Sequence, residues 1–137
     1  MTEDCIFCKI VAGLAPCFEI ARDDRALAFM DINPASPGHV LVVSTEHAAD
    51  LHGLSPEGLA AAALMARRVA GAIQTVLAPD GINLIQANGP GAAQSVAHFH
   101  IHVLPRTMGD RLPINWLLSP GDRTAIGALA ERLKAAL

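Results

Sequence analysis

Histidines alternate with apolar residues over positions 98–104, which read HFHIHVL. Successive side chains of a β-strand point to opposite faces, so His98, His100 and His102 are expected on one face and the apolar residues between them on the other. The apolar face would pack the strand against a core, whereas a row of imidazoles adds little to packing. The alternation therefore predicts a strand over 97–104 whose histidine face carries a function.

Three interpretations of this histidine face are open. It could be an exposed polar face without a function. Alternating imidazoles also chelate Zn²⁺ well, which would make the chain a zinc metallohydrolase with His98, His100 and His102 as ligands. An imidazole can instead act as a nucleophile, because with an ordinary pKa of about 6.5 it is largely neutral at pH 7. A neutral nucleophile suits attack on an anionic phosphoanhydride or phosphoramidate.

The loop that precedes the histidines favours the nucleophile. Residues 88–95 read NGPGAAQS. The small residues allow a ligand to approach the backbone closely, and Gln94 and Ser95 add an amide and a hydroxyl that can contact phosphate. The loop is not a P-loop, since the motif G-x-x-x-x-G-K-[ST] is absent. The catalytic-zinc alternative lacks a carboxylate-base motif such as H-E-x-x-H and leaves this loop unexplained.

The rest of the chain predicts an α+β fold. Ser55 is a good N-cap for a long amphipathic helix, and Pro56 fits the first position of that helix. Consecutive strands with one long helix between them and one helix at the end are typical of an antiparallel sheet. The expected elements are a short helical turn within 5–13, strands at 19–22, 26–31, 39–44, 82–86 and 97–104, and helices at 56–77 and 124–137.

Composition excludes several classes of protein. Hydrophobic residues make up 52% of the chain and charged residues 17%, which excludes intrinsic disorder. A net charge of −3 gives no basic surface for nucleic acid. No apolar run is long enough to span a membrane, and the acidic start MTED lacks the basic region of a secretory signal, so a cytoplasmic location is predicted. A chain of 137 residues fits one domain, 1–137, and its apolar excess favours an oligomer.

The segments CIFCKI, DINPASPGHVLVV and AAQSVAHFHIHVLPR resemble the histidine triad (HIT) family, whose motif is His-φ-His-φ-His-φ-φ with φ hydrophobic. The resemblance is closest to the bacterial nucleotide-binding, Hint-like branch, covers nearly the whole chain and thins beyond Thr107. It implies a HIT-like fold with a five-stranded antiparallel sheet, which dimerises into a ten-stranded sheet. In such a homodimer, the long helix is expected at the interface and Trp116 is expected near the neighbouring site.

The same resemblance implies a hydrolase or transferase for phosphoanhydride or P–N bonds. Its substrates would be purine nucleoside phosphoramidates, adenylates or dinucleotide polyphosphates. A nucleotidyl group would be transferred to the middle histidine and then hydrolysed, and no organic cofactor would be required. Ala87 and Ala93 depart from the family, which often has Asn or Gln at the first position and usually Gly at the second. The alternative is therefore a nucleotide-binding regulatory protein with little turnover.

The resemblance also assigns roles by position. His100 would attack the phosphorus, His102 would contact phosphate oxygens, Ser95 would lie near the phosphate or leaving group, and His39 would support the triad. Asp31 would bind the ribose hydroxyls, and the apolar positions would hold the base, although each of them could equally be plain core. The implied nucleotide-binding residues are Phe7, Ile10, Phe29, Asp31, Ile32, Leu41, Asn88, Gln94, Ser95, His100 and His102.

Cysteine spacing indicates a metal. Cys5-x-x-Cys8 is half of a zinc site and is incomplete alone. The resemblance implies that bacterial members of the family complete such a Cys₂His₂ site with residues that correspond to His47 and His98. A structural zinc is therefore expected. Cys17 is expected to be a buried small hydrophobe. The remaining histidine, His52, is expected at the surface or at a helix end.

Overall fold

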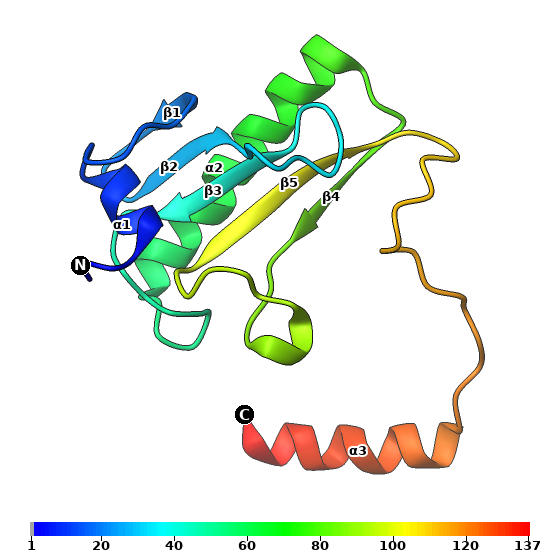
Figure 1. Cartoon of the computed structure of the whole chain (residues 1–137). Helices are drawn as coiled ribbons and strands as arrows, with labels where there is room; N and C mark the ends of the chain where they lie inside the picture. Colours follow the sequence, from blue (N-terminus) through cyan, green and yellow to red (C-terminus); the bar gives the residue numbers. More distant parts are fainter. Residues whose placement is uncertain (1) are drawn as a thin grey trace.

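The computed structural model describes residues 2–137 and contains a single five-stranded antiparallel sheet among them, in the order β1-β2-β3-β5-β4. One long helix covers one face of the sheet, and a short helix lies on the other (Figure 1). The α+β architecture predicted from the sequence is thus confirmed. The elements are α1 (Ile6–Val11), β1 (Glu19–Arg22), β2 (Ala26–Met30), β3 (Val40–Ser44), α2 (Pro56–Leu77), β4 (Gly81–Ile85), the 3₁₀ turn η1 (Pro90–Ala92), β5 (His100–Arg106) and α3 (Arg123–Ala136).

The central strands are buried on both faces and divide their side chains between two apolar clusters. On β2, Ala26 and Ala28 face α2, whereas Leu27 and Phe29 face α1. β3 repeats this alternation. On β5, Ile101 and Val103 join the α2 side. The histidines of β5 consequently lie on the α1 side, at the edge of the smaller cluster.

Helix α2 begins where the sequence predicts. The Ser55 hydroxyl accepts a hydrogen bond from the backbone N–H of Gly58 (3.0 Å), and the Glu46 carboxylate in turn accepts from the backbone N–H and the hydroxyl of Ser55 (2.8 and 2.9 Å). The face of α2 that packs on β2, β3 and β5 is built mainly from small and apolar residues. Its buried members are Gly58, Ala62, Met65, Ala66, Val69 and Ile73.

The histidine strand differs from the prediction at both ends, since β5 runs from His100 to Arg106 rather than from 97 to 104. The chain bends at 96–98, and the backbone N–H of Phe99 bonds to the carbonyl of Ala48 (2.7 Å) rather than to a neighbouring strand. His98 is therefore outside the strand, although it lies on the same side of the sheet as His100. At the far end, pairing with β4 continues through Pro105 and Arg106.

The C-terminal part stands apart from the sheet (Figure 1). The stretch 112–118 is irregular, and α3 starts after the N-cap Asp122, whose carboxylate accepts a hydrogen bond from the backbone N–H of Thr124 (3.0 Å). No residue of α3 is buried. This part of the chain carries several exposed apolar side chains, namely Trp116, Leu117, Leu118, Ile126, Leu129 and Leu133. Over residues 2–137, no helix has both the length and the hydrophobicity needed to cross a membrane.

Candidate active site and metal cluster

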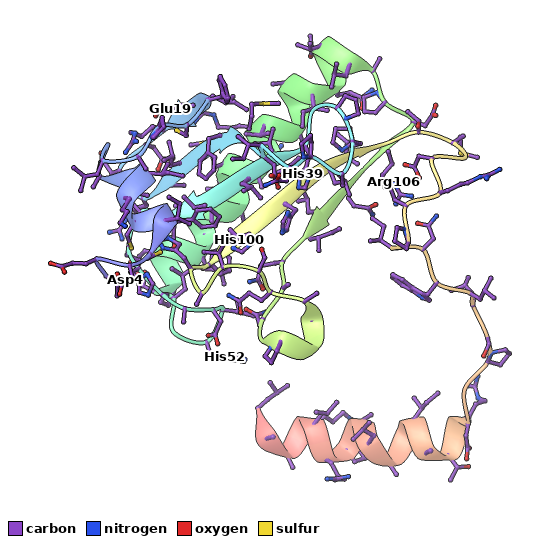
Figure 2. All side chains as sticks on the ribbon, viewed as in Figure 1. Asp4, Glu19, His39, His52, His100 and Arg106 are labelled. Atoms are coloured by element: carbon purple, nitrogen blue, oxygen red, sulfur yellow. The ribbon has the colours of Figure 1, made fainter. Side chains whose placement is uncertain are left out.

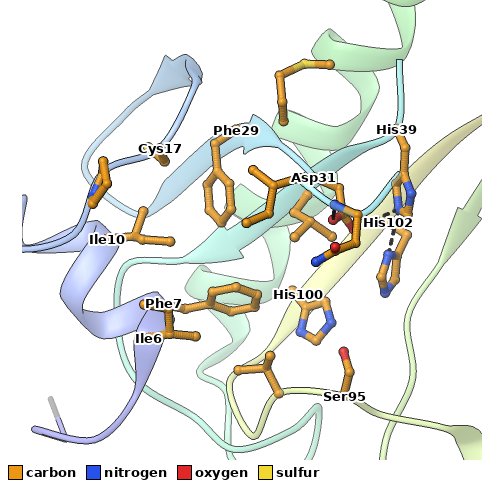
Figure 3. Close-up of a pocket in the computed structure, with 16 residues that line it drawn as sticks. Ile6, Phe7, Ile10, Cys17, Phe29, Asp31, His39, Ser95, His100 and His102 are labelled. Atoms are coloured by element: carbon orange, nitrogen blue, oxygen red, sulfur yellow. Dashed lines mark hydrogen bonds and ion pairs between the residues drawn. The ribbon is translucent and has the colours of Figure 1, made fainter. Parts of the chain in front are cut away.

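A cavity of about 530 Å³ opens on the α1 side of the sheet, between α1, β2, β3, β5 and the loops around them (Figure 3). It holds the two strand histidines, His100 and His102, together with His39 from the position just before β3 and Ser95 from the loop before β5. Most of the residues assigned from the sequence meet here. Those on its wall are Phe7, Ile10, Phe29, Asp31, Ile32, His39, Leu41, Ser95, His100 and His102.

The tautomer of His100 is set by a backbone group. Its Nδ1 lies 2.7 Å from the carbonyl oxygen of His98, and a carbonyl can only accept. Neutral His100 therefore carries its proton on Nδ1 and has a free lone pair on Nε2. The side chain is buried, and Figure 3 shows its ring between Phe7 and Ser95. The ring presents a nucleophilic nitrogen to the cavity without a prior deprotonation.

His39 and His102 form a hydrogen-bonded relay in which both rings carry their proton on Nε2, whereas His100 carries its proton on Nδ1. The backbone N–H of Ala35 donates to Nδ1 of His39 (3.0 Å), so neutral His39 carries its proton on Nε2. That nitrogen lies 2.9 Å from Nδ1 of His102 and donates to it. His102 is thereby left with its own proton on Nε2. It offers a hydrogen-bond donor, which complements the lone pair of His100.

Burial keeps the relay neutral. It lowers the pKa of His102 to about 4, with smaller contributions in the same direction from the charges of His100 and His39. Burial also lowers the pKa of His39, against the attraction of the Asp31 carboxylate, whose Oδ2 lies 3.6 Å from Nε2 of His39. Both rings are consequently neutral near pH 7, as the hydrogen-bond pattern requires.

Asp31 follows β2 directly and brings a carboxylate to the cavity wall. Its Oδ1 accepts a hydrogen bond from the backbone N–H of Asn33 (2.8 Å), which holds the side chain in place. The two oxygens have further lone pairs, so the carboxylate can accept hydrogen bonds from a diol.

The other end of the cavity is apolar. The rings of Phe7 and Phe29 pack edge to face with centroids 5.7 Å apart, next to Ile10 and Leu41. These residues belong to the apolar core and also line the cavity. Ile32 is different, because it is 76% exposed and only borders the cavity.

Two of the assigned nucleotide-binding residues, Asn88 and Gln94, are not among those that line the cavity. The Asn88 amide oxygen accepts from the backbone N–H of Leu51 (2.8 Å), and its nitrogen donates to Gln86. The Gln94 amide accepts from Gly89 N–H (2.8 Å) and donates to the carbonyls of Ala49 and Val96. Both amides are thus engaged in shaping the loop itself.

Ala87 and Ala93, the two positions that depart from the pattern of the family that the sequence resembles, can also be located in the structure. Ala93, where glycine is usual, has a φ of 58° and lies in the left-handed region that glycine adopts without strain. Ala93 therefore keeps the backbone shape of a glycine at a cost of about 1 kcal/mol. Ala87 is half-buried beside Asn88.

Sequence reasoning missed several wall residues. Cys17 was expected in the core, but it is half-buried on the cavity wall, where burial raises the pKa of its thiol. Asn33 and Val96 lie within the motifs DINPASPGHVLVV and AAQSVAHFHIHVLPR, close to Asp31 and Ser95. Their closeness in sequence to these two assigned residues was the feature that could have predicted their place on the cavity wall. His52 is exposed, as expected (Figure 2). The other missed members of the wall are Ile6, Pro16 and Met30.

The four proposed metal ligands converge beside this cavity. Their ligand atoms all lie within 4.8 Å of one another. Nδ1 of His98 is 3.4 Å from Sγ of Cys5, 3.6 Å from Sγ of Cys8 and 3.3 Å from Nδ1 of His47. Tetrahedral Zn²⁺ with ordinary bond lengths places two nitrogens about 3.3 Å apart and a nitrogen and a sulfur about 3.6 Å apart. The donor set and its spacing therefore fit a zinc ion.

The hydrogen bonding of His98 also fits a metal ligand. Its Nε2 lies 2.7 Å from the carbonyl of Ser44, so the proton is on Nε2 and the lone pair of Nδ1 points to the two cysteines. The same orientation argues against the catalytic-zinc alternative. The free nitrogens of His98 and His100 point into different sites, so the three triad histidines do not form one chelate.

A second group, Asp31, His39 and His102, also has its ligand atoms within 4.8 Å of one another. A metal on Nε2 of His39 would require the proton on Nδ1, where it would face the N–H of Ala35. Two donors would then oppose each other at 3.0 Å. This group is consequently arranged to hold a proton rather than a metal ion.

Comparisons with known proteins agree with the geometry. The HIT domain family model matches residues 13–109. Adenosine 5'-monophosphoramidase hnt1 of Schizosaccharomyces pombe is 40% identical over 132 residues, which cover 96% of each chain. A HIT family protein from Bacillus anthracis superposes with a TM-score of 0.91 at 31% identity and covers 100% of this chain and 99% of its own. A zinc-bound histidine triad family protein from Mycobacterium smegmatis has a TM-score of 0.76 at 37% identity, with 98% of each chain covered. By the match to the family model and to these relatives, as well as by its histidine geometry, the chain belongs to the HIT family.

Proposed function

We propose that this protein hydrolyses purine nucleoside phosphoramidates and related adenylates or dinucleotide polyphosphates through a nucleotidyl-histidine intermediate. The observation that carries the proposal is the opposite tautomers of neighbouring histidines, a lone pair on Nε2 of His100 and an N–H on Nε2 of His102. The relative from S. pombe is named for cleavage of a phosphoramidate, which supports the P–N bond as the bond that breaks.

In the first step, the lone pair of His100 Nε2 forms a bond to phosphorus and the P–N bond to the leaving amine breaks. The leaving nitrogen takes up a proton, for which the Ser95 hydroxyl on the cavity wall is the proposed path. The Nδ1–H bond to the carbonyl of His98 stabilises the imidazolium that forms. In the second step, water attacks phosphorus, releases a proton and returns the lone pair to Nε2, which leaves a nucleoside monophosphate and the amine.

Charge on the phosphoryl oxygens is met by the N–H of His102, which the Ala35–His39 relay keeps pointed into the cavity. A neutral donor retains this role across the pH range in which His102 stays unprotonated on Nδ1. His39 acts through His102 and is therefore a positioning residue.

We propose that the base lies in the apolar end, against Phe7 and Phe29, with the ribose diol on Asp31. A second hollow of about 460 Å³ adjoins the cavity and shares Ile6, Ser95 and Val96 with it. This hollow is the proposed site of the leaving group. Asn88 and Gln94 would support binding through the loop rather than by direct contact.

The test is a pair of variants in the same strand. His100→Ala should lose turnover of adenosine phosphoramidate by about 10⁴-fold or more while still binding AMP. His102→Ala should retain the nucleophile and lose about 10²- to 10³-fold. A mass spectrum of rapidly quenched enzyme, kept out of acid, should show a nucleotidyl group on His100. An adduct on another residue, or full turnover by His100→Ala, would contradict the mechanism.

Cys5, Cys8, His47 and His98 are proposed to hold one structural zinc ion. The tetrahedral spacing of their ligand atoms and the zinc-bound relative from M. smegmatis support this. Such an ion would contribute to folding, because it ties the segment before β1 to the sheet.

We also propose a homodimer, supported by apolar surface left uncovered in one chain. Strand β4 is an edge strand on which Leu84 is 53% exposed, and Trp116 and the apolar face of α3 are exposed as well. An uncovered edge strand and exposed apolar side chains of this extent are typical of a subunit interface. Sedimentation at micromolar protein should give a species of twice the chain mass. A species of 14.3 kDa alone would contradict the dimer.

A further inference from the structure

Helix α1 takes part in two sites at once. Cys5, its N-cap, and Cys8 supply two of the four atoms of the metal cluster. Phe7 and Ile10, from the same helix, line the nucleotide cavity. A helix of six residues is too short to be stable alone in water, so whatever holds α1 to the sheet also sets the position of this wall.

Phe7 connects the two sites directly. Its ring packs edge-on against His98 and His100, with centroids 5.8 and 5.2 Å away. His98 in turn contributes its Nδ1 to the metal cluster and its carbonyl to Nδ1 of His100. The metal-binding atoms, the cavity wall and the proposed nucleophile are thus joined by contacts among a few buried side chains.

The other contacts between α1 and the sheet are either non-directional or exposed. The packing of Phe7 and Ile10 on Phe29 is non-directional, and the bond from the Arg22 guanidinium to the carbonyl of Val11 (3.1 Å) is exposed. The metal ligands, by contrast, come from α1, from the loop after β3 and from the segment before β5, and one ion would fix all three.

We propose that Cys5 and Cys8 are positioning residues for nucleotide binding, because the metal that they hold fixes the cavity wall formed by Phe7 and Ile10. The inference rests on the proposed nucleotide site and the proposed zinc. Metal and nucleotide then bind cooperatively, and the coupling is reciprocal. Zinc must raise the affinity for AMP by the same factor by which AMP raises the affinity for zinc. We expect a factor on the order of tenfold, within the common range for coupled sites.

The full chain is used for both halves of the test. Calorimetry gives the affinity for AMP of the zinc-loaded and the metal-free chain, and a chromophoric chelator gives the affinity for zinc without AMP and with saturating AMP. The two ratios should agree at about tenfold. Circular dichroism shows whether the metal-free chain keeps its sheet and α2.

Two cavity variants separate a path through α1 from general stabilisation. Phe7→Leu keeps an apolar wall but removes the ring contacts to His98 and His100. Ile32→Ala trims an exposed residue on the loop side of the same cavity, outside α1. With AMP at saturation, Phe7→Leu should bring the effect of AMP on zinc affinity close to onefold, whereas Ile32→Ala should preserve it. Because the chelator populates the metal-free chain, the comparison is made between variants whose metal-free forms give the same circular dichroism spectrum, so that a contribution from folding is common to both.

Three results would overturn the inference. Equal AMP affinity with and without zinc would remove the coupling and leave the proposed function standing. An effect of AMP on zinc affinity that is as large in Phe7→Leu as in the unaltered chain would show that α1 is not the path. Failure of the zinc-loaded chain to bind AMP would overturn the proposed function and the coupling together.

Discussion

Two neighbouring clusters of metal-ligating side chains differ in where their protons lie. In the cluster of Cys5, Cys8, His47 and His98, the Ser44 carbonyl accepts the proton of His98 from the far side of the ring. The lone pair that remains faces the thiols. In the cluster of Asp31, His39 and His102, the backbone N–H of Ala35 donates a hydrogen bond to Nδ1 of His39. The proton of His39 is therefore on Nε2, which faces His102. A carbonyl behind an imidazole leaves a lone pair facing the site, and an N–H behind it leaves a proton there.

The largest effect is expected from removing a thiol of the first cluster. Cys8→Ser should lose the bound zinc and lower the melting temperature by about 10 °C or more, because metal-binding free energy is folding free energy. Metal analysis and thermal unfolding measure the two effects. The matched control is Cys17→Ser, which alters a half-buried cysteine outside the cluster and should keep the zinc. Zinc that stays with Cys8→Ser but leaves with His102→Ala would reverse the assignment of the two clusters.

An intermediate effect is expected from acid. Because burial lowers the pKa of His102 from 6.5 to about 4, the unfolded chain binds more protons than the folded chain between these pH values. The contribution of His102 to stability is therefore complete above pH 6.5 and falls by about 1 to 3 kcal/mol as the pH drops to 4. Unfolding by urea at a series of pH values measures it.

The acid prediction has a matched pair of variants. His102→Gln should flatten part of this decline, whereas His52→Gln, at an exposed position, should leave the curve unchanged. His39, whose pKa burial also lowers, adds a decline of the same sign that persists in His102→Gln. Identical curves for His102→Gln and the unaltered chain would show that His102 is not held neutral by the fold.

The smallest effect should come from the backbone donor of the second cluster. Ala35→Pro removes the backbone N–H that donates a hydrogen bond to Nδ1 of His39, so His39 can then carry its proton on Nδ1. Turnover should fall by about tenfold, as for the loss of one hydrogen bond. Zinc binding should also rise above one ion per chain in excess zinc, as measured by equilibrium dialysis. Ala35→Gly keeps the N–H and serves as the control. Equal zinc binding by the two variants would mean that the Ala35 N–H does not exclude metal from this cluster.

Local sequence determined much of the framework. Alternation over 98–103 separated the histidines from Phe99, Ile101 and Val103, because side chains of a strand must alternate. Ser55 and Pro56 marked the start of α2 correctly, since an N-cap acts within one turn. The family motifs brought Asp31, His39, Ser95, His100 and His102 to one cavity, whereas His98 lies in the neighbouring metal cluster.

Other features lay beyond any local pattern. Asn88 and Gln94 are polar loop residues of the kind that contacts phosphate, yet their amides bond to Leu51 and Ala49, about forty residues earlier in the chain. His98 fits the alternation of a strand, yet it lies in the bend before β5, where the Ala48 carbonyl holds the backbone. Cys17 was placed on the cavity wall by the packing of α1 against β2.

The sequence by itself therefore determined most of the polar residues that gather at the cavity, because strand alternation, helix capping and the triad motif act over a few neighbouring residues. Only the tertiary structure decided what each histidine does there. The function of an imidazole depends on which nitrogen holds its proton, and that is set by backbone groups behind the ring. For His98 the partner is the carbonyl of Ser44, which lies 54 positions away in the chain. No local pattern of residues specifies such a partner, since it is brought into place only when β3 pairs with β5.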